Sequence, residues 1–432
     1  MSENTSMAMN DTYDYSTVKK LPFKDILKRI GPGIILTGVV IGPGAITTAA
    51  MLGAKYGYSL LWLLIPIAFM ATTFMLTTYR ISLLTGMPAI HAIQHYYGKG
   101  AAKFVGIATF LACMFFTMGN ISGTGAGMNL IFGINWKIGA VVMICVMIYC
   151  YFSKGVYSKV EKGIMVCILG MICAFYATLI GTGGPLWSEL SQGLTHWTFP
   201  TGSLTTALAF ISTNAALTTG IYGTYLGIEK KWKKEDLYNG VMKADAIAHI
   251  IGVILISGAI VLVGAIVLFP TGTEISTPVQ LAEMLMPIIG NAAKYIMGIA
   301  LLGAGFSSLL GNTQRGVVLL CAGFDKETSL ESKNIKWGSM LVLAFAAVIC
   351  FSYNGSPVQL ILIANVATSI ATPVAGLFIT MMIWKKDINK SHKAPRALQI
   401  SMTISYLFCL VITVSALVNQ IPKFINSFIS IF

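Results

Sequence analysis

Residues 31–57 read GPGIILTGVVIGPGAITTAAMLGAKYG, an apolar run interrupted at its middle by Gly42-Pro43-Gly44-Ala45. Proline has no amide donor and glycine tolerates non-helical backbone angles, so the run predicts a helix that is broken near its midpoint. Backbone that is unpaired at membrane depth is tolerated only where it is buried in protein or lines a watery cavity. The stretch therefore predicts a membrane helix whose break lines a binding site, with a simple proline kink as the alternative.

The composition of the whole chain is that of an all-α integral membrane protein. Of its 432 residues, 56% are hydrophobic and 10% are charged, and the mean hydropathy is +0.76. A water-soluble core cannot hold so large an apolar fraction, and the apolar runs have the length of a membrane helix. We expect about eleven spans, at 30–52, 60–83, 102–132, 138–151, 164–180, 204–226, 244–269, 292–320, 337–351, 357–384 and 397–418.

The basic residues predict the orientation of these spans. With the N-terminus in the cytoplasm, all but four of the 29 Lys and Arg residues fall on the inner side, the exceptions being Lys55, Lys137, Lys294 and Lys423. This asymmetry follows the positive-inside rule and explains the net charge of +13 without a nucleic-acid partner. We expect a protein of a prokaryotic cytoplasmic membrane, with lipid as its main partner. Its oligomeric state stays open.

The sixth expected span carries a second interruption, the polar stretch STNAALTTG at 212–220. Broken helices five spans apart are typical of transporters built from two inverted five-helix repeats. The predicted organisation is a cytoplasmic tail at 1–29, a first repeat at 30–182, a second repeat at 203–386, and an extra helix with a short extracytoplasmic end at 397–432.

Three stretches resemble one family. Residues 31–86 are similar to the opening of the Nramp family of divalent-metal transporters, NLIFGI at 129–134 resembles the end of its third helix, and GAGFSSLLGNTQRG at 303–316 resembles its eighth. The resemblance implies the LeuT-type fold with alternating access. It also implies a metal site, because the family binds its cargo through a DPGN motif and an MPH motif.

Both of these motifs are altered in this chain. Gly42 and Ala45 stand where the family has its aspartate and asparagine, and Leu217, Thr218 and Thr219 stand at the MPH positions. Thr117 and Asn120 occupy the places of two acids of the family's proton route. A divalent ion at mid-membrane normally needs at least one formal negative charge.

We therefore expect a secondary transporter of a small organic anion, zwitterion or neutral solute, with divalent metal (Mn, Fe or Mg) as the alternative. Half-helix N-termini favour anionic groups, and small residues at the breaks are expected to leave room for a solute. We expect no cofactor, and we single out no residue as a metal ligand. The predicted substrate-binding residues are Gly42, Pro43, Gly44, Ala45, Thr47, Thr48, Asn120, Thr213, Asn214, Ala215, Leu217, Thr218 and Thr219.

Other polar residues are candidates for coupling to H⁺ or Na⁺ or for gating, and the sequence does not decide which ion applies. They are Thr117, Asp245, His249, Ser307, Asn312 and Asn365. A helix cap is the preferred alternative for Asp245 and His249, and hydrogen bonding between helices is an equal alternative for the serine and asparagines. A channel or a non-transporting homologue is less favoured, and the scarcity of acids and histidines at membrane depth argues against an enzyme.

Overall fold

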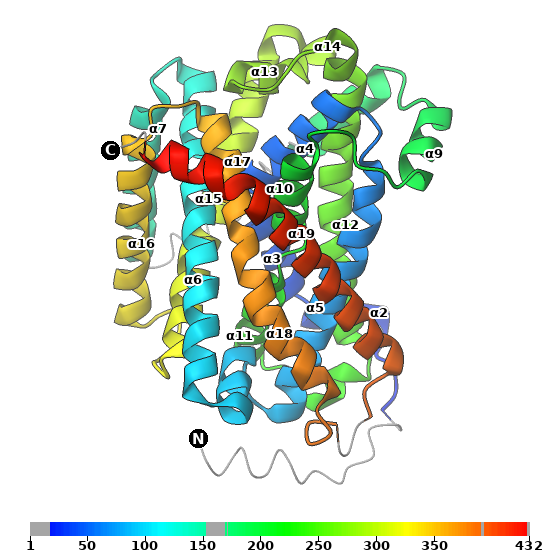
Figure 1. Cartoon of the computed structure of the whole chain (residues 1–432), viewed down its shortest axis with the longest axis vertical. Coiled ribbons are helices and arrows are strands. Elements are labelled where there is room, and N and C mark those ends of the chain that lie inside the picture. The colour runs from blue at the N-terminus through cyan, green and yellow to red at the C-terminus, as the bar shows by residue number, and fades with distance from the viewer. Residues whose placement is uncertain (1–17, 153–168, 171, 390–392, 430–432) are drawn as a thin grey trace.

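The computed structural model describes residues 18–152, 169–170, 172–389 and 393–429, and within these ranges every regular element is a helix. Figure 1 shows them as one upright bundle, with α9, α13 and α14 at one end and α2 at the other. The helices are α2 (Phe23–Arg29), α3 (Pro32–Val40), α4 (Pro43–Tyr56), α5 (Leu64–Thr85), α6 (Ala89–Phe132), α7 (Trp136–Phe152), α9 (Trp187–Thr195), α10 (Leu204–Asn214), α11 (Leu217–Glu229), α12 (Val241–Val263), α13 (Pro278–Glu283), α14 (Met286–Ile289), α15 (Ala293–Gly323), α16 (Lys333–Ser352), α17 (Pro357–Ala367), α18 (Ala371–Trp384) and α19 (Arg396–Ile429).

Length and hydropathy mark eight helices of the described part as able to cross a membrane, or nine with the pair α3 and α4. Two shorter apolar helices, Trp136–Phe152 and Ile172–Gly181, fall on the expected spans at 138–151 and 164–180. Within the described residues the expected spans thus coincide with helices, while 164–168 and 171 of the fifth expected span lie outside the described residues. α6 is divided by a kink at Gly98 (φ 87°), so the expected span from 102 falls within its second part. α19 runs on to Ile429, beyond the expected end of the last span at 418.

Both expected breaks are present and are narrower than predicted. α3 and α4 meet at Ile41 and Gly42 with a bend of 61°, so that Pro43 already opens the first turn of α4. α10 and α11 are separated only by Ala215 and Ala216. The expected interruption at 212–220 was too wide, because its polar side chains bond to carbonyl groups of their own helix and leave the helix intact.

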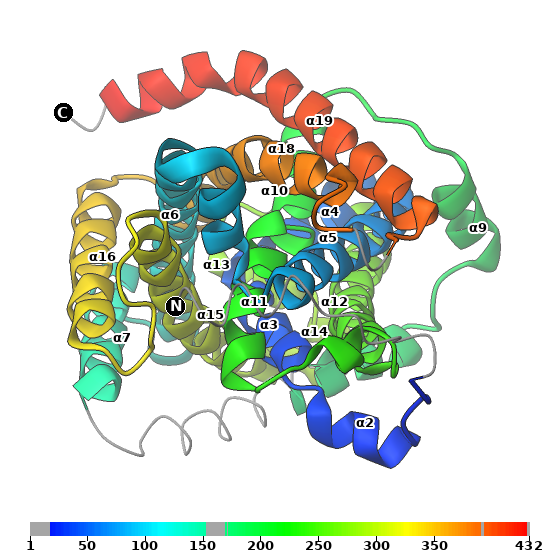
Figure 2. The ribbon, with the colours of Figure 1, turned by 90° about the horizontal axis from the view of Figure 1, so that it is seen from below.

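The broken helices lie in the middle of the bundle. α3 packs against α11, α12 and α15, and α4 packs against α6, α10, α12 and α17. Figure 2 shows, from below, that α19 crosses the outside of the bundle, where it contacts α5, α10 and α18. The residues at the two breaks are consequently shielded from lipid by the surrounding helices.

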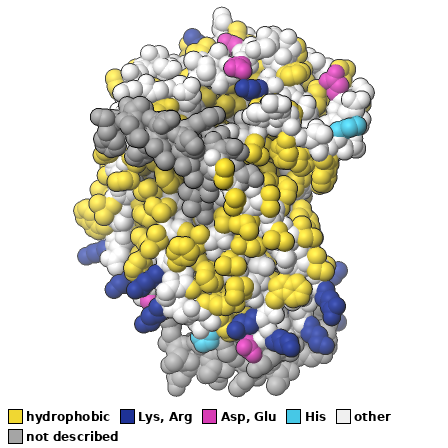
Figure 3. All heavy atoms as spheres, viewed as in Figure 1, with side chains coloured by type: hydrophobic (Ala, Val, Ile, Leu, Met, Phe, Trp, Pro, Cys, Tyr) yellow, Lys and Arg dark blue, Asp and Glu magenta, His cyan; other side chains and the backbone are white. Residues whose placement is uncertain are grey.

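The surface in Figure 3 carries a broad hydrophobic band, and Lys and Arg side chains gather below it, toward the end of the bundle at which α2 lies. This is the pattern that the positive-inside rule leads one to expect at one face of a membrane. Arg80 and Arg315 do not belong to this group. We had counted both with the inner connections, but they lie within α5 and α15 and are 7% and 4% exposed.

Candidate functional site

The break between α3 and α4 is filled by polar side chains. A Cβ atom added to Gly42 would lie 2.6 Å from Ser308 Oγ of α15 and 2.7 Å from Asn120 Oδ1 of α6. A Cβ atom on Gly44 would lie 2.6 Å from Asn365 Oδ1 of α17. The expectation that these glycines leave room for a solute was therefore wrong: their missing side chains admit three side chains from neighbouring helices.

Pro43 is held from two sides by glycine-bearing helices. A Cβ atom on Gly123 of α6 would lie 2.1 Å from Pro43 Cβ, and one on Gly305 of α15 would lie 3.1 Å from Pro43 Cγ. The proline ring thus fits where two helices lack side chains. This close packing fixes the start of α4, and with it the position of Ala45 in the same first turn.

A neutral hydrogen-bond network ties the end of α3 to α15 and α6. Ser308 Oγ donates to the carbonyl of Val39 (2.7 Å) and accepts from Asn120 Nδ2 (2.8 Å). Asn312 Nδ2 lies 3.2 Å from the same Val39 carbonyl and 3.0 Å from Ser308 Oγ. The break is therefore stabilised by amides and a hydroxyl, and no carboxylate of the described residues takes part.

Several buried polar atoms at the break have no hydrogen-bond partner in the described part of the chain. These are Asn120 Oδ1, which faces Gly42, together with Thr47 Oγ1 of α4 and Asn365 Nδ2. An unmade hydrogen bond at a buried polar group costs about 1–3 kcal/mol. Such atoms are the groups that a ligand at the break could satisfy.

Other predicted site residues are occupied by local bonds. The hydroxyls of Thr48, Thr117 and Thr213 each donate to a carbonyl one turn earlier in the same helix. Asn214 Nδ2 donates to Phe210 O, and its Oδ1 accepts from Ser257 Oγ of α12 at 2.8 Å. These contacts fit the packing interpretation, and they leave open whether the same groups also meet a substrate.

The second break presents small and apolar residues. Ala215 and Leu217 are buried, and so are Thr218 and Thr219 in the first turn of α11. Leu217 Cδ2 lies 3.6 Å from the Cβ position of Gly376 on α18, so this side chain packs outward from the break toward a neighbouring helix.

Arg315 of α15 lies one turn beyond Asn312 and reaches the second broken helix. Its Nη1 donates to Thr219 Oγ1 (3.3 Å), its Nε donates to Cys113 Sγ (3.3 Å), and its Nη2 donates to Asn312 Oδ1. All three partners are neutral. We had not singled this residue out, although a charged residue inside an apolar span is a recognised sequence signal of a functional position.

Asp245 and His249 of α12 contact the N-terminal half of α3, whose N-terminal end is called the inner end below after the orientation expected from the sequence. Asp245 Oδ1 accepts from the backbone N–H of Gly31 (3.0 Å), and its Oδ2 accepts from Gly33 N–H (2.9 Å) and from the Tyr79 hydroxyl (3.1 Å). His249 Nδ1 and Thr37 Oγ1 are 3.0 Å apart. The geometry is that of a carboxylate capping the N-terminus of α3, which is the alternative that we had preferred.

A second buried carboxylate, that of Asp236, makes an ion pair near the same end of α3. Arg29 Nη2 lies 2.7 Å from Asp236 Oδ2, and the carboxylate is fully buried while the arginine is partly exposed. Trp232 Nε1 donates to the carbonyl of Arg29 at 3.1 Å.

The remaining coupling candidate, Ser307, lies on the other flank of α3, where its Oγ is 3.0 Å from the Cβ position of Gly38.

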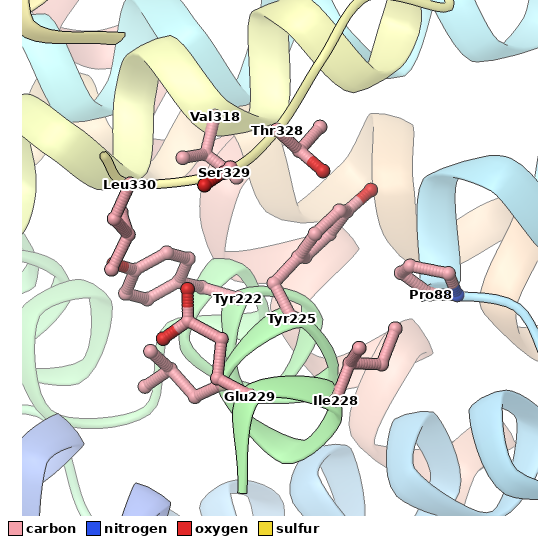
Figure 4. A pocket seen from close by; sticks show the side chains of 10 residues that line it. Pro88, Tyr222, Tyr225, Ile228, Glu229, Val318, Thr328, Ser329 and Leu330 are labelled. Atoms are coloured by element: carbon pink, nitrogen blue, oxygen red, sulfur yellow. The ribbon is translucent and has the colours of Figure 1, made fainter. Parts of the chain in front are cut away.

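The described residues contain no cluster of three or more His, Cys, Asp and Glu side chains that could hold a metal ion. A cavity of about 250 Å³ does exist, toward the end of the bundle where α11 ends (Figure 4). Figure 4 shows Tyr222, Tyr225 and Glu229 of α11 on one side of it and Val318 of α15 on another. This cavity is not at the breaks, but Val318 and Tyr222 are each one helical turn from Arg315 and Thr219.

Comparison with known proteins shows which family has this architecture. The family model described as Nramp, natural resistance-associated macrophage protein-like, matches residues 33–419. The chain belongs to the Nramp family. It is 24% identical over 392 residues to the divalent metal cation transporter MntH of Brucella suis, an alignment covering 86% of this chain and 84% of the relative. It is 22% identical over 421 residues to metal transporter Nramp3 of Oryza sativa, covering 94% and 76% respectively.

Solved structures agree on the fold. The manganese transporter of Eremococcus coleocola superposes with a TM-score of 0.77 at 17% identity, covering 96% of this chain and 92% of that one. MhsT, solved with L-phenylalanine, superposes with a TM-score of 0.60 at 16% identity, covering 88% and 98%. The predicted LeuT-type fold and the Nramp resemblance are thus confirmed, and this Nramp protein is an integral membrane transporter.

Proposed function

We propose that this Nramp protein is a secondary transporter of a divalent metal cation, which binds at the two breaks through neutral oxygen atoms. The names of the family relatives support a metal cargo better than the organic solute that we had ranked first. The observation that carries the proposal is the position of Asn120 Oδ1. It is a buried acceptor without a partner in the described chain, and it lies beside Gly42, where the family's carboxylate would stand.

The available ligands favour a hard cation. Amide, hydroxyl and carbonyl oxygens suit Mg²⁺ and Mn²⁺, whereas the thioether and imidazole groups that suit softer ions are absent from residues 202–228. Mg²⁺ also keeps several of its waters and so needs fewer protein ligands. We expect Asn120 Oδ1 and Thr47 Oγ1 to contact the ion or its water shell.

The lack of a carboxylate sets the expected affinity. Each formal charge removed from a poorly hydrated site costs several kcal/mol of cation binding, and every ~1.4 kcal/mol is a factor of ten. We expect saturation near millimolar rather than micromolar concentrations, and a weaker preference for Mn²⁺ over Mg²⁺ than a site with a thioether would have.

Uptake into proteoliposomes tests this proposal. An internal metal-sensitive dye would report Mn²⁺ and Mg²⁺ entry against empty vesicles, and we expect saturable, mutually competitive uptake. Asn120→Ala and Thr47→Ala should each reduce it at least about tenfold, the factor that a weakened ligand contact gives. Thr109→Ala is the matched control, because Thr109 is also buried in α6 but bonds only to its own helix. Absence of saturable uptake of either ion in a folded preparation would remove metal as the cargo.

A small organic anion, zwitterion or neutral solute remains the second candidate. It is favoured by one observation: the buried acids of the described residues, Asp236 and Asp245, lie at the N-terminal end of α3 and not at either break. In the same vesicles, loss of metal uptake together with a thermal shift by a small carboxylate or amino compound would select this candidate.

A further inference from the structure

Arg315 is a buried positive charge without a counter-ion. The side chain is 4% exposed, and no Asp or Glu of the described residues lies within ion-pair distance of it. Arginine stays protonated in proteins, so burial cannot be relieved by loss of a proton. An isolated charge in a protein interior is strongly disfavoured unless it is paired and hydrogen bonded. The described chain supplies the hydrogen bonds but not the paired charge.

The guanidinium also lies at the positive end of a helix. Thr219, which accepts from Arg315 Nη1 at 3.3 Å, is in the first turn of α11, directly after the break at Ala215 and Ala216. The N-terminus of a helix carries a partial positive charge and unpaired amide donors, which favour an anion and disfavour a cation. Two positive features that repel each other are therefore placed side by side, a costly arrangement unless something negative binds between them.

The guanidinium has more N–H donors than its hydrogen bonds to described residues use. It has five N–H groups, and three hydrogen bonds to described residues use one each of Nε, Nη1 and Nη2. Each terminal nitrogen thus keeps one further N–H without an acceptor in the described chain. The planar fork of arginine matches the two oxygens of a carboxylate, which makes it the usual partner where planar oxyanions are recognised.

The cavity in Figure 4 lies close to this position. Val318 and Tyr222, which line it, are each one turn from Arg315 and Thr219 on α15 and α11. Glu229 is the acidic residue among those that line the cavity. It is exposed and lies roughly 15 Å from Thr219 along α11, too far to form an ion pair with the guanidinium at Thr219.

We propose that Arg315 and the N-terminus of α11 form an anion-binding site that takes a small monoanion, with a carboxylate as the best fit. The site goes beyond the cation transport proposed above and does not depend on it. With a metal cargo, the anion neutralises the guanidinium next to the cation. With an organic cargo, the anion is the cargo's own carboxylate.

Thermal unfolding of the purified full-length protein in detergent, without divalent cations, tests the site. Sodium acetate, chloride and gluconate are compared at equal sodium concentration. We expect acetate to raise the unfolding temperature in a saturable way by a few degrees, because a ligand that binds only the folded state stabilises it. A rise with chloride alone would assign an inorganic anion, and a rise with acetate alone would assign a carboxylate. Equal responses to all three salts would overturn the proposal.

Variants connect the shift to the guanidinium. Arg315→Gln should abolish the acetate response, and Arg315→Lys, which keeps the charge but loses the fork, should weaken it at least about tenfold. Thr109→Ala should respond like the unmodified protein. If Arg315→Gln does not fold, the lysine variant carries the test alone. An acetate response that is unchanged in either Arg315 variant would show that the anion binds elsewhere, while the metal-uptake result would stand independently.

Discussion

The two ends of α3 are held by different chemistry. At the inner end, two buried carboxylates hold the chain in place. Asp245 accepts hydrogen bonds from the N–H groups of Gly31 and Gly33, and Asp236 forms an ion pair with Arg29. At the end next to the break, Ser308 and Asn312 bond the Val39 carbonyl and no described carboxylate takes part.

This difference shows that buried acids lie where they fix the position of a helix, whereas none of the described acids lies at the break. The inner end is capped according to its helix dipole, because a carboxylate belongs at an N-terminus. The break is instead closed by amides that fill the space of a missing side chain. Four predictions follow from the contrast, each directed at one of the two ends.

The largest effect is expected for Gly42→Asp, which places at the break the acid that the family resemblance leads one to expect there. Its Cβ would lie within 2.8 Å of both Ser308 and Asn120, and its charge would be buried without a partner. Overpacking and an unpaired buried charge together should cost on the order of 3 kcal/mol or more. Thermal unfolding in detergent measures this loss.

Gly38→Ala is the control for Gly42→Asp, because its Cβ would meet only the end of the Ser307 side chain at 3.0 Å. A Gly42→Asp protein with unchanged stability and tighter Mn²⁺ binding would contradict the packing described here. It would mean that the space at Gly42 is open after all.

Asp245→Asn should cost about 2 kcal/mol, because it removes the charge from hydrogen bonds made to two backbone amides and to Tyr79. The inner end of α3 should loosen. A cysteine introduced at position 37 should then react faster with a membrane-impermeant maleimide applied from the inner side. Tyr79→Phe, which removes one donor and leaves both amide bonds, should give a smaller increase. Equal rates of labelling in the Thr37→Cys protein and in its Asp245→Asn and Tyr79→Phe variants would show that Asp245 does not hold this end.

Much of this arrangement could be predicted from the sequence, and the features that could not be predicted have identifiable physical causes. The Gly42-Pro43 break was predictable because proline and glycine act locally on the backbone. The true extent of the second break was not, because Thr213 and Asn214 bond to their own helix and so behave as helix residues. The filling of the Gly42 and Gly44 spaces depends on Asn120 and Asn365, which are distant in sequence. Arg315 was visible as a charge in an apolar span, and was missed only because it was counted with an inner loop.

Arg29→Ala should have a smaller effect than Asp245→Asn. The arginine is partly exposed, and the buried Asp236 keeps hydrogen bonds from Lys233 N–H and Asn239 Nδ2 after its loss. We expect about 1 kcal/mol, diminishing as salt is raised, in the same unfolding experiment. Lys28→Ala is the control, because its contact with Asp25 is exposed at both partners. A loss for Arg29→Ala that equals that for Asp245→Asn would mean that the two acids share the inner end evenly.

The smallest expected effect is a coupling energy at the break, between Ser308→Ala and Gly42→Ala. In Ser308→Ala alone the Val39 carbonyl keeps its bond from Asn312 Nδ2, but Asn120 Nδ2 and Asn312 Nδ2 lose the Ser308 hydroxyl as an acceptor, so we expect a loss of about 1 kcal/mol. The informative measurement is a double-mutant cycle with Gly42→Ala, whose new Cβ would meet Ser308 Oγ at 2.6 Å. Removing that oxygen should relieve part of the clash, so the double mutant should be more stable than the sum of the single losses by about 0.5 kcal/mol or more. Additive losses would mean that Ser308 does not occupy the space beside Gly42. The neutral closure of the break would then rest on Asn120 alone.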